Sequence, residues 1–262
     1  MKRLIFIYIL YSSFPLISMD RAEKKVQEQG RIARELLVYD YQAHGEPRIR
    51  FREKLQAYIK DNPGTILWSA SQARLGDVFR DEQRIVPAKE AYMAAYNHKQ
   101  GLPFARGWAA LQLGYISLSE AQYEAAKELL LFSEHRLSEN YFYHVQNGLG
   151  VAYYCLRDMD NARACWQRII ETADKAIKAL PKKEVNVERK RAFLNKFLGR
   201  ACLNSSVLLE TSGEYERAAE YLTTSQRLSP SLTPEQYNER LLHLRASATK
   251  ATPSSEKEQL AF

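Results

Sequence analysis

The feature that most constrains the fold is a segment in which two amphipathic helical patterns are joined by a short polar break. The segment is Asn147–Ile170, NGLGVAYYCLRDMDNARACWQRII. Apolar residues in its first part recur at intervals of three and four, which places them on one face of a helix. These residues are Leu149, Ala152, Tyr153 and Leu156. After polar residues 157–161, a second apolar face begins, with Ala162 as a small contact point and Trp166 as the large residue between the helices.

The same design recurs upstream and downstream of this segment. Leu-Gly pairs end at Gly76, Gly114 and Gly150, and each is followed at the same interval by an alanine. A fourth copy keeps the turn and the alanine but has Ser205-Ser206 in place of Leu-Gly. The four alanines are Ala88, Ala126, Ala162 and Ala218. Consecutive copies are therefore 38, 36 and 56 residues apart, and the chain is predicted to be a stack of helical hairpins.

The order of these residues resembles the tetratricopeptide repeat (TPR) family, whose pattern includes Leu-Gly, Tyr, Ala and Pro at a period of about 34 residues. The resemblance covers roughly residues 65–230. Two of the periods are slightly long, and the fourth copy lacks Leu-Gly, so another two-helix repeat of the same general shape stays open. The resemblance implies an all-α fold, a right-handed solenoid of antiparallel helical hairpins with a C-terminal capping helix.

We expect four repeats with an additional element at each end. A degenerate leading hairpin is expected first, because one face of a terminal repeat meets water. The capping helix has a strong start signal, in which Thr233 caps the helix and Gln236 reaches back to it. The expected parts are the leading hairpin 20–64, the four repeats 65–230, the capping helix 231–248 and a disordered tail 249–262 that is rich in Ser, Thr, Glu and Lys.

The 56-residue step contains about 20 extra residues of helical composition. We expect about ten added residues on each of two adjacent helices, which is about 15 Å of extra length. The apolar residues expected to pack this extended pair together are Ile177, Leu180, Phe193 and Phe197.

The elongated hairpin, residues 174–196, is also the basic part of the chain. It carries eight basic and three acidic residues, and so holds most of the formal net charge of +7. The residues at its tip are Lys182, Lys183, Arg189, Lys190 and Arg191. Docking on an anionic membrane surface and simple solvation of a long hairpin both stay open. Nucleic acid is disfavoured as a partner, because the charge is one local patch rather than a broad basic surface.

The N-terminal residues 1–19 have the pattern of a signal peptide or an N-terminal anchor. Lys2 and Arg3 precede a continuously apolar run, residues 4–11, and small residues follow near Ser18. The run is short for a transmembrane helix, which needs about 20 apolar residues. We expect an exported (periplasmic or secreted) or membrane-anchored protein, with an ordinary first helix as the alternative.

Residue patterns typical of enzymes are missing from the sequence. The five histidines do not have the spacing of metal ligands, and there is no Gly-x-Ser-x-Gly nucleophile turn. Gly148-Leu149-Gly150 begins like a dinucleotide motif but lies inside a predicted helix. The three cysteines fall within the repeats, where cysteine acts as a small apolar residue, although a Cys155–Cys165 bridge stays open. We expect no catalytic residues, no metal and no cofactor.

The resemblance to TPR proteins implies a concave groove, lined by the first helix of each hairpin, that holds a protein or peptide partner. The family's groove positions correspond here to Ala70, Ala73, Asp77, Trp108, Leu111, Tyr115, His144, Asn147, Val151, Tyr154, Arg200, Leu203 and Val207. The residues selected from these for partner binding are Trp108, Leu111, Tyr115, His144, Asn147, Tyr154 and Arg200. Packing between repeats is the alternative role for Trp108 and Tyr115. Ala73 and Asp77 stand where chaperone-binding members have a clamp for an acidic C-terminus, which argues against that ligand class.

The sequence therefore predicts a non-catalytic scaffold for protein–protein interaction, whose partner it does not identify. The alternative function is that of an assembly subunit, which docks on lipid headgroups or nucleic acid through the basic hairpin tip.

Overall fold

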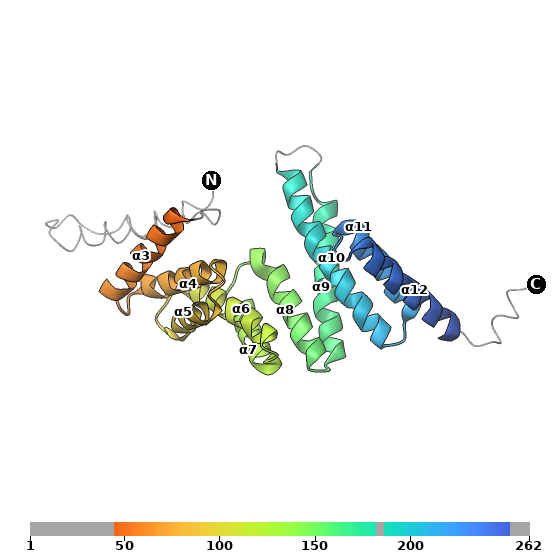
Figure 1. The fold of residues 1–262 in the computed structure, drawn as a ribbon, viewed down its shortest axis with the longest axis horizontal. Coiled ribbons are helices and arrows are strands. Elements are labelled where there is room, and N and C mark those ends of the chain that lie inside the picture. Colours follow the sequence, from red (N-terminus) through yellow and green to blue (C-terminus); the bar gives the residue numbers. More distant parts are fainter. Residues whose placement is uncertain (1–44, 182–185, 252–262) are drawn as a thin grey trace, which may run out of the picture.

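The computed structural model describes residues 45–181 and 186–251, and these form an elongated stack of antiparallel helices (Figure 1). This part of the chain contains α-helices and one short 3-10 helix, with no β-strand. The elements are α3 (Glu46–Asp61), α4 (Ile66–Asp81), α5 (Ile85–Asn97), α6 (Pro103–Ser119), α7 (Tyr123–Glu134), η1 (Glu139–Tyr141), α8 (Phe142–Cys155), α9 (Met159–Lys178), α10 (Val187–Thr211), α11 (Tyr215–Leu228) and α12 (Pro234–Ala251). The prediction of an all-α solenoid of helical hairpins is confirmed.

The hairpins pair as the sequence indicates. α4 packs on α5, α6 on α7, α8 on α9, and α10 on α11. The second helix of each hairpin also packs on the first helix of the next one, and α12 packs on α11. Each repeat therefore buries its apolar faces only with help from its neighbours, as in other repeat proteins.

A small residue and a large residue, one on each helix, set the distance between the two helices of a hairpin. A Cβ atom added at Gly76 would lie 2.5 Å from the Tyr92 ring, and one added at Gly114 would lie 2.8 Å from the Leu130 side chain. An added Cβ at Gly150 would overlap the ring of Trp166. The fourth hairpin keeps the arrangement with buried serine and leucine at the corresponding positions, Ser206 and Leu222. In the first three hairpins glycine is needed because any side chain at that position would overlap the large residue opposite.

The four anchor alanines are all fully buried, as predicted. Overpacking a filled core position typically costs about 1–3 kcal/mol. We therefore expect Ala162→Leu to lower the free energy of unfolding by about 1–3 kcal/mol in urea denaturation followed by circular dichroism. Ala164→Leu is the matched control, because Ala164 is exposed on the same helix. Equal midpoints for the two variants would contradict the packing described above.

Each turn between the helices of a hairpin contains one residue in the left-handed conformation. These residues are Gln83 (φ 60°), Ala121 (φ 58°), Arg157 (φ 64°) and Gly213 (φ 78°). In each turn the next backbone N–H donates to a carbonyl five residues earlier, for example Gln122 to Ser117 at 2.8 Å and Glu214 to Leu209 at 2.8 Å. This is the Schellman pattern of helix termination. The four turns therefore share one geometry, although only the last uses glycine.

The left-handed backbone predicts that Ala121→Gly stabilises the protein. The left-handed conformation costs an L-residue about 1–2 kcal/mol, and a glycine at this position avoids that cost. Glycine also has a larger conformational entropy in the unfolded chain, which offsets part of the stabilisation. The expected net gain is about 0.5–1 kcal/mol in urea denaturation. Gly213→Ala should shift the midpoint in the opposite direction. A destabilised Ala121→Gly protein would contradict this account of the turns.

The predicted elongated hairpin is present, with α9 of 20 residues and α10 of 25 residues. α9 and α10 project beyond the end of α8 at the top of Figure 1. Phe197 is buried with its ring stacked on that of Tyr143 of α8, 5.4 Å away, and Ile177 and Leu180 of α9 pack against the same core. The expectation for Phe193 is wrong, because its side chain is 43% exposed. Leu194, the next residue of α10, is buried in its place.

Both ends of the described chain extend the stack. α3 contributes Leu55 and Tyr58 to the core with α4, and α12 contributes the fully buried Leu244 to the core with α11. The capping box of α12 is confirmed, since the Thr233 N–H donates to Gln236 Oε1 at 3.0 Å and the Gln236 N–H to Thr233 Oγ1 at 3.3 Å. α12 ends three residues later than expected, at Ala251.

Several predictions lie outside the described residues. They are the signal peptide or anchor at 1–19, the first helix of the leading hairpin, Lys182 and Lys183 at the hairpin tip, and the tail from residue 252. Export thus stays a prediction from the sequence. No helix in residues 45–181 and 186–251 has the length and apolar character needed to span a membrane.

Candidate functional site

The first helices of the four hairpins line one surface of the solenoid. α4 contacts α6, α6 contacts α8, and α8 contacts α10. We refer to this surface as the inner surface. All seven partner-binding residues predicted from the sequence lie on α6, α8 and α10, so the structure brings their helices together.

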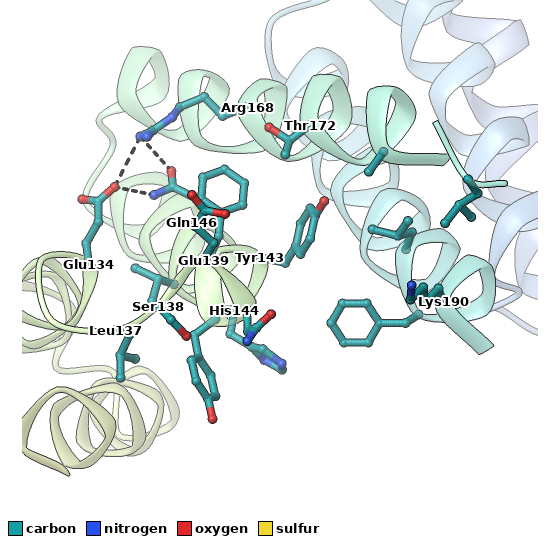
Figure 2. Close-up of a pocket in the computed structure, with 18 of the residues that line it drawn as sticks. Glu134, Leu137, Ser138, Glu139, Tyr143, His144, Gln146, Arg168, Thr172 and Lys190 are labelled. Atoms are coloured by element: carbon teal, nitrogen blue, oxygen red, sulfur yellow. Dashed lines mark hydrogen bonds and ion pairs between the residues drawn. The ribbon is translucent and has the colours of Figure 1, made fainter. Parts of the chain in front are cut away.

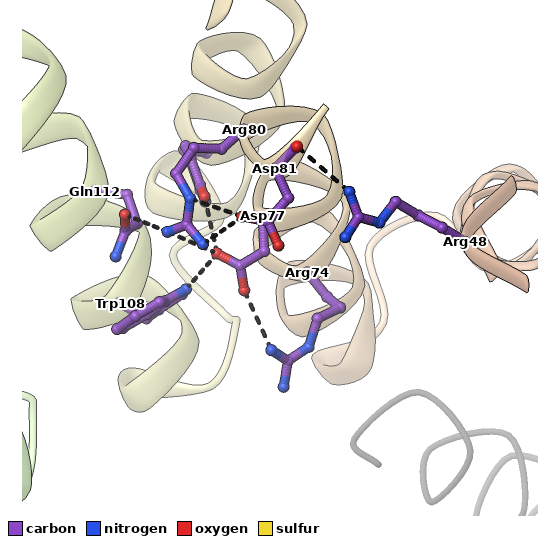
Figure 3. A network of polar contacts seen from close by, with 8 residues as sticks. Arg48, Arg74, Asp77, Arg80, Asp81, Trp108 and Gln112 are labelled. Atoms are coloured by element: carbon purple, nitrogen blue, oxygen red, sulfur yellow. Dashed lines mark hydrogen bonds and ion pairs between the residues drawn. The ribbon is translucent and has the colours of Figure 1, made fainter. Parts of the chain in front are cut away.

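The N-terminal part of the inner surface is occupied by a network around the carboxylate of Asp77 (Figure 3). Trp108 Nε1–H donates to Asp77 Oδ1 at 2.9 Å, and the Tyr92 hydroxyl donates to the same oxygen at 2.8 Å. Arg74 approaches Oδ2 at 3.2 Å, and Arg80 lies 3.7 Å from Oδ1. Trp108 therefore connects α6 to α4. This geometry favours the packing role for Trp108 over a ligand-binding role.

Asp77 itself is only 1% exposed. The prediction that Asp77 faces the groove is therefore wrong. The same prediction for Ala73 is also wrong, because Ala73 is 3% exposed. Burial raises the pKa of the Asp77 carboxyl, although Arg80 and the hydrogen bonds from Trp108 and Tyr92 act in the opposite direction. Because the folded state binds this proton more tightly, the contribution of Asp77 to stability is largest at low pH. It declines as the pH rises through the pKa of the folded state.

The network predicts that Asp77→Ala weakens the junction between the first two repeats. The substitution leaves the Tyr92 and Trp108 donors unpaired and Arg74 and Arg80 without their shared carboxylate, so we expect a loss of at least about 2 kcal/mol in urea denaturation.

Glu120→Ala is the control for this substitution. It removes a pair with Lys89 whose two side chains are about one-third exposed, and such pairs contribute at most about 1 kcal/mol. Equal losses in Asp77→Ala and Glu120→Ala would show that the network does not hold the junction.

The middle of the inner surface is joined by two further hydrogen bonds between helices. The Tyr115 hydroxyl donates to the backbone carbonyl of His144 at 2.8 Å, which connects α6 to α8. Asn204 Nδ2 donates to Asn147 Oδ1 at 3.1 Å, which connects α8 to α10. Leu111 is 1% exposed and packs in the core, so the expectation that it faces the groove is wrong.

In the C-terminal part of the inner surface, on α8 and α10, some of the predicted groove residues remain accessible to solvent. Arg200 is exposed on α10 and forms no ion pair with any residue of the described ranges. The positive charges of Arg200 and Lys196 lie near His144, whose pKa is lowered by burial first and by these two charges in addition. Tyr154 is partly buried and packs against Trp166, with ring centroids 6.1 Å apart.

A pocket of about 1200 Å³ lies at the N-terminal end of α8, beside the extended parts of α9 and α10 (Figure 2). Its lining includes His144 from the predicted groove together with Arg189 and Lys190 from the predicted hairpin tip. The structure thus brings together residues that the sequence assigned to two different sites. Arg191 does not line the pocket and pairs with Glu188 at 3.0 Å.

A polar cluster in the pocket was missed by the sequence analysis. Gln146 is fully buried; its Nε2–H donates to Glu134 Oε1 at 2.7 Å, and Arg168 donates to its Oε1 at 3.1 Å. Arg168 also approaches Glu134 at 3.5 Å. Figure 2 shows this cluster at one end of the pocket. Little in the sequence indicates that Gln146 is buried, because a glutamine next to Asn147 is typical of a solvent-exposed helix face.

The described residues do not cluster in the manner of a metal site, since no three His, Cys, Asp or Glu side chains among them could hold an ion together. The three cysteines are free thiols, so the structure does not contain the Cys155–Cys165 bridge left open by the sequence. Burial raises the pKa of both Cys165 and Cys202 to about 11. These two thiols are therefore poor nucleophiles at neutral pH.

Comparison with known proteins supports the repeat assignment. Residues 199–232 match the tetratricopeptide repeat model; this is the second half of α10 with α11, the copy that lacks Leu-Gly. Among solved structures, the chain is similar to TPR-like repeats of a Podosopora anserina protein described as a kinesin light chain. The match covers 80% of this chain and 97% of the other, with a TM-score of 0.50 and 16% identity. At that identity the likeness concerns the fold alone. No curated protein matches the chain significantly.

Proposed function

We propose that this TPR-like solenoid is a non-catalytic scaffold that holds a segment of a partner protein on the α8–α10 half of its inner surface. TPR-like repeats commonly mediate protein–protein interaction, and their stacked first helices supply an extended surface. The observation that carries the proposal is the difference between the two halves of that surface. Asp77, Trp108 and Tyr115 are engaged in contacts between repeats, whereas Arg200 is exposed and unpaired among the described residues.

The proposed binding surface combines apolar contact with polar groups at fixed positions. Val151, Leu203 and Val207 are partly exposed on α8 and α10 and supply apolar area. Asn147 and Arg200 supply hydrogen-bonding groups beside them. Because Asn147 is already held by Asn204, its orientation is set before a partner arrives, which lowers the entropic cost of binding.

The alternative function, docking of the basic hairpin tip on an anionic surface, has less support. Arg191 is paired with Glu188, and Arg189 and Lys190 line the pocket. Lys182 and Lys183 lie outside the described residues. The proposed partner site is therefore the inner surface rather than the hairpin tip.

The test is affinity capture from the native source with wild-type protein and two arginine variants, read out by quantitative mass spectrometry. Arg200→Glu should reduce the captured partner at least tenfold, because it reverses the charge in the middle of the proposed surface. Arg245→Glu, a matched reversal of an exposed arginine on α12, should not. Both variants should keep the wild-type melting temperature. Equal capture by all three proteins would contradict the proposed surface.

A further inference from the structure

The acidic residues of the inner-surface helices are few, and all of them are paired. The first helices α4, α6, α8 and α10 together contain four acidic residues, and α6 and α8 contain none of them. Each of the four pairs with an arginine: Asp77 with Arg74, Asp81 with Arg80, Glu188 with Arg191 and Glu210 with Arg240. Within the described residues, these helices therefore offer no carboxylate that lacks a nearby arginine.

Two cations on α10 lack such a partner. Lys196 and Arg200 are both exposed, and neither forms an ion pair with any residue of the ranges 45–181 and 186–251. They are four residues apart, which places them on the same side of the helix and about 6 Å apart along its axis. The C-terminal half of the inner surface therefore carries two unpaired positive charges at a fixed spacing.

The charge of Arg200 acts on both neighbouring first helices. Burial lowers the pKa of His144 on α8, and the charges of Arg200 and Lys196 lower it further. Burial raises the pKa of Tyr115 on α6, and the charge of Arg200 acts in the opposite direction. Glu139, the acidic residue nearest to His144 in the sequence, is not among the groups that shift the pKa of His144. The positive charge in this region is therefore not offset from α6 or α8.

The spacing of the two cations fits an extended chain. Consecutive residues of an extended segment are about 3.3 Å apart, and their side chains point alternately to opposite sides. Side chains at alternate positions therefore lie on one side, about 6.6 Å apart, which is close to the spacing of about 6 Å between Lys196 and Arg200. A segment that lies along α10 with acidic residues at two alternate positions can place one carboxylate against each cation.

The same side of α10 continues with aliphatic residues. Leu203 and Val207 follow Arg200 at intervals of three and four residues, and both are partly exposed, as is Val151 on α8. Nucleic acid would gain little from such residues, because its affinity comes mainly from many phosphate contacts. A protein segment that combines carboxylates with an aliphatic side chain matches both parts of this surface.

We propose that the partner segment is extended and acidic, with Asp or Glu at two alternate positions and an aliphatic residue two positions further along. The two carboxylates pair with Lys196 and Arg200, and the aliphatic side chain packs against Leu203. This inference rests on the proposed function and adds the chemical class of the partner. It concerns internal acidic side chains, and so differs from a clamp for an acidic C-terminus, whose positions are held here by Ala73 and Asp77.

Selection from a random peptide library tests the predicted composition. The full chain is immobilised and panned against displayed dodecapeptides, and the library is sequenced before and after selection. Asp or Glu at alternate positions should be at least threefold more frequent in the selected peptides than in the input library, and Lys and Arg should be depleted. Selected peptides without this acidic bias, or no selected peptides at all, would overturn the proposal.

Charge variants test whether the acidic bias comes from the two cations. Lys196→Glu with Arg200→Glu should abolish the bias and select basic peptides instead, and Lys196→Gln with Arg200→Gln should abolish it without this reversal. Arg245→Glu with Lys250→Glu, a matched double reversal of exposed residues on α12, should keep the bias. All three variants should keep the wild-type melting temperature, because the substituted side chains are exposed. An unchanged acidic bias in both variants of Lys196 and Arg200 would overturn the proposal.

The imidazole of His144 reports where an acidic peptide binds. A synthetic peptide of the most enriched sequence should raise the pKa of His144 in NMR titrations of the full chain, because it brings negative charge to Lys196 and Arg200. By linkage, the peptide should bind more tightly as the pH falls through the pKa of His144. A peptide that binds without changing this pKa lies elsewhere on the protein, and that outcome would overturn the proposal.

NMR mapping separates this inference from the proposed function. Selected peptides that lack the acidic bias but shift the backbone amide signals of α8 and α10 would overturn the acidic class alone and support the partner surface. Peptides that shift none of these signals would contradict the partner surface as well. A single-stranded DNA of 12 nucleotides that displaces the acidic peptide at an equal or lower concentration would overturn the proposal in favour of nucleic acid.

Discussion

The fit of a large side chain against a bare backbone is the contact on which the rest of this structure depends. Tyr92, Leu130 and Trp166 each rest where a glycine of the preceding helix leaves room. In the fourth hairpin, buried Ser206 and Leu222 stand at the corresponding positions. The large residue varies in shape, from tyrosine to leucine to tryptophan, but the position opposite it is always glycine or serine. Packing of this kind tolerates hydrophobic exchange at one position only if the other remains small.

The identity of the large residue opposite the small one, which is Tyr92, Leu130, Trp166 or Leu222, affects which residues of the inner surface are exposed. Tyrosine at position 92 brings a hydroxyl into the core, and a buried hydroxyl requires an acceptor. Asp77 meets this requirement and, once buried, also accepts from Trp108 of the next hairpin. The Trp108 side chain is therefore hydrogen-bonded between two repeats and is not free to bind a ligand through its indole N–H. In the later hairpins, leucine and tryptophan occupy the large position. There Tyr115 makes a single hydrogen bond to the next hairpin, to the His144 carbonyl, and Val151 remains partly exposed.

The long hairpin changes the structure in a different way. Extending α9 and α10 enlarges the contact between two hairpins, because Ile177 and Leu180 join the core there, and it also creates a pocket beside the start of α8. The basic residues of this hairpin, which the sequence analysis assigned to an exposed tip, partly line that pocket instead. The partner surface and the pocket thus have different physical origins. The first follows from the repeat pattern, and the second follows from the departure from it.

The sequence by itself determined the helices, the turns and the order in which the hairpins stack. Helix periodicity, capping residues and the small-to-large spacing are local or nearly local signals, and Ala88, Ala126, Ala162 and Ala218 were sufficient to align the repeats. Only the tertiary structure decided which inner residues remain available, because a contact such as Trp108 with Asp77 joins residues of different hairpins. The pocket could not be predicted either, since it depends on how three consecutive helices of unequal length, α8, α9 and α10, are aligned once they are packed side by side. Exposure is a property of the assembled stack, and no local pattern encodes it.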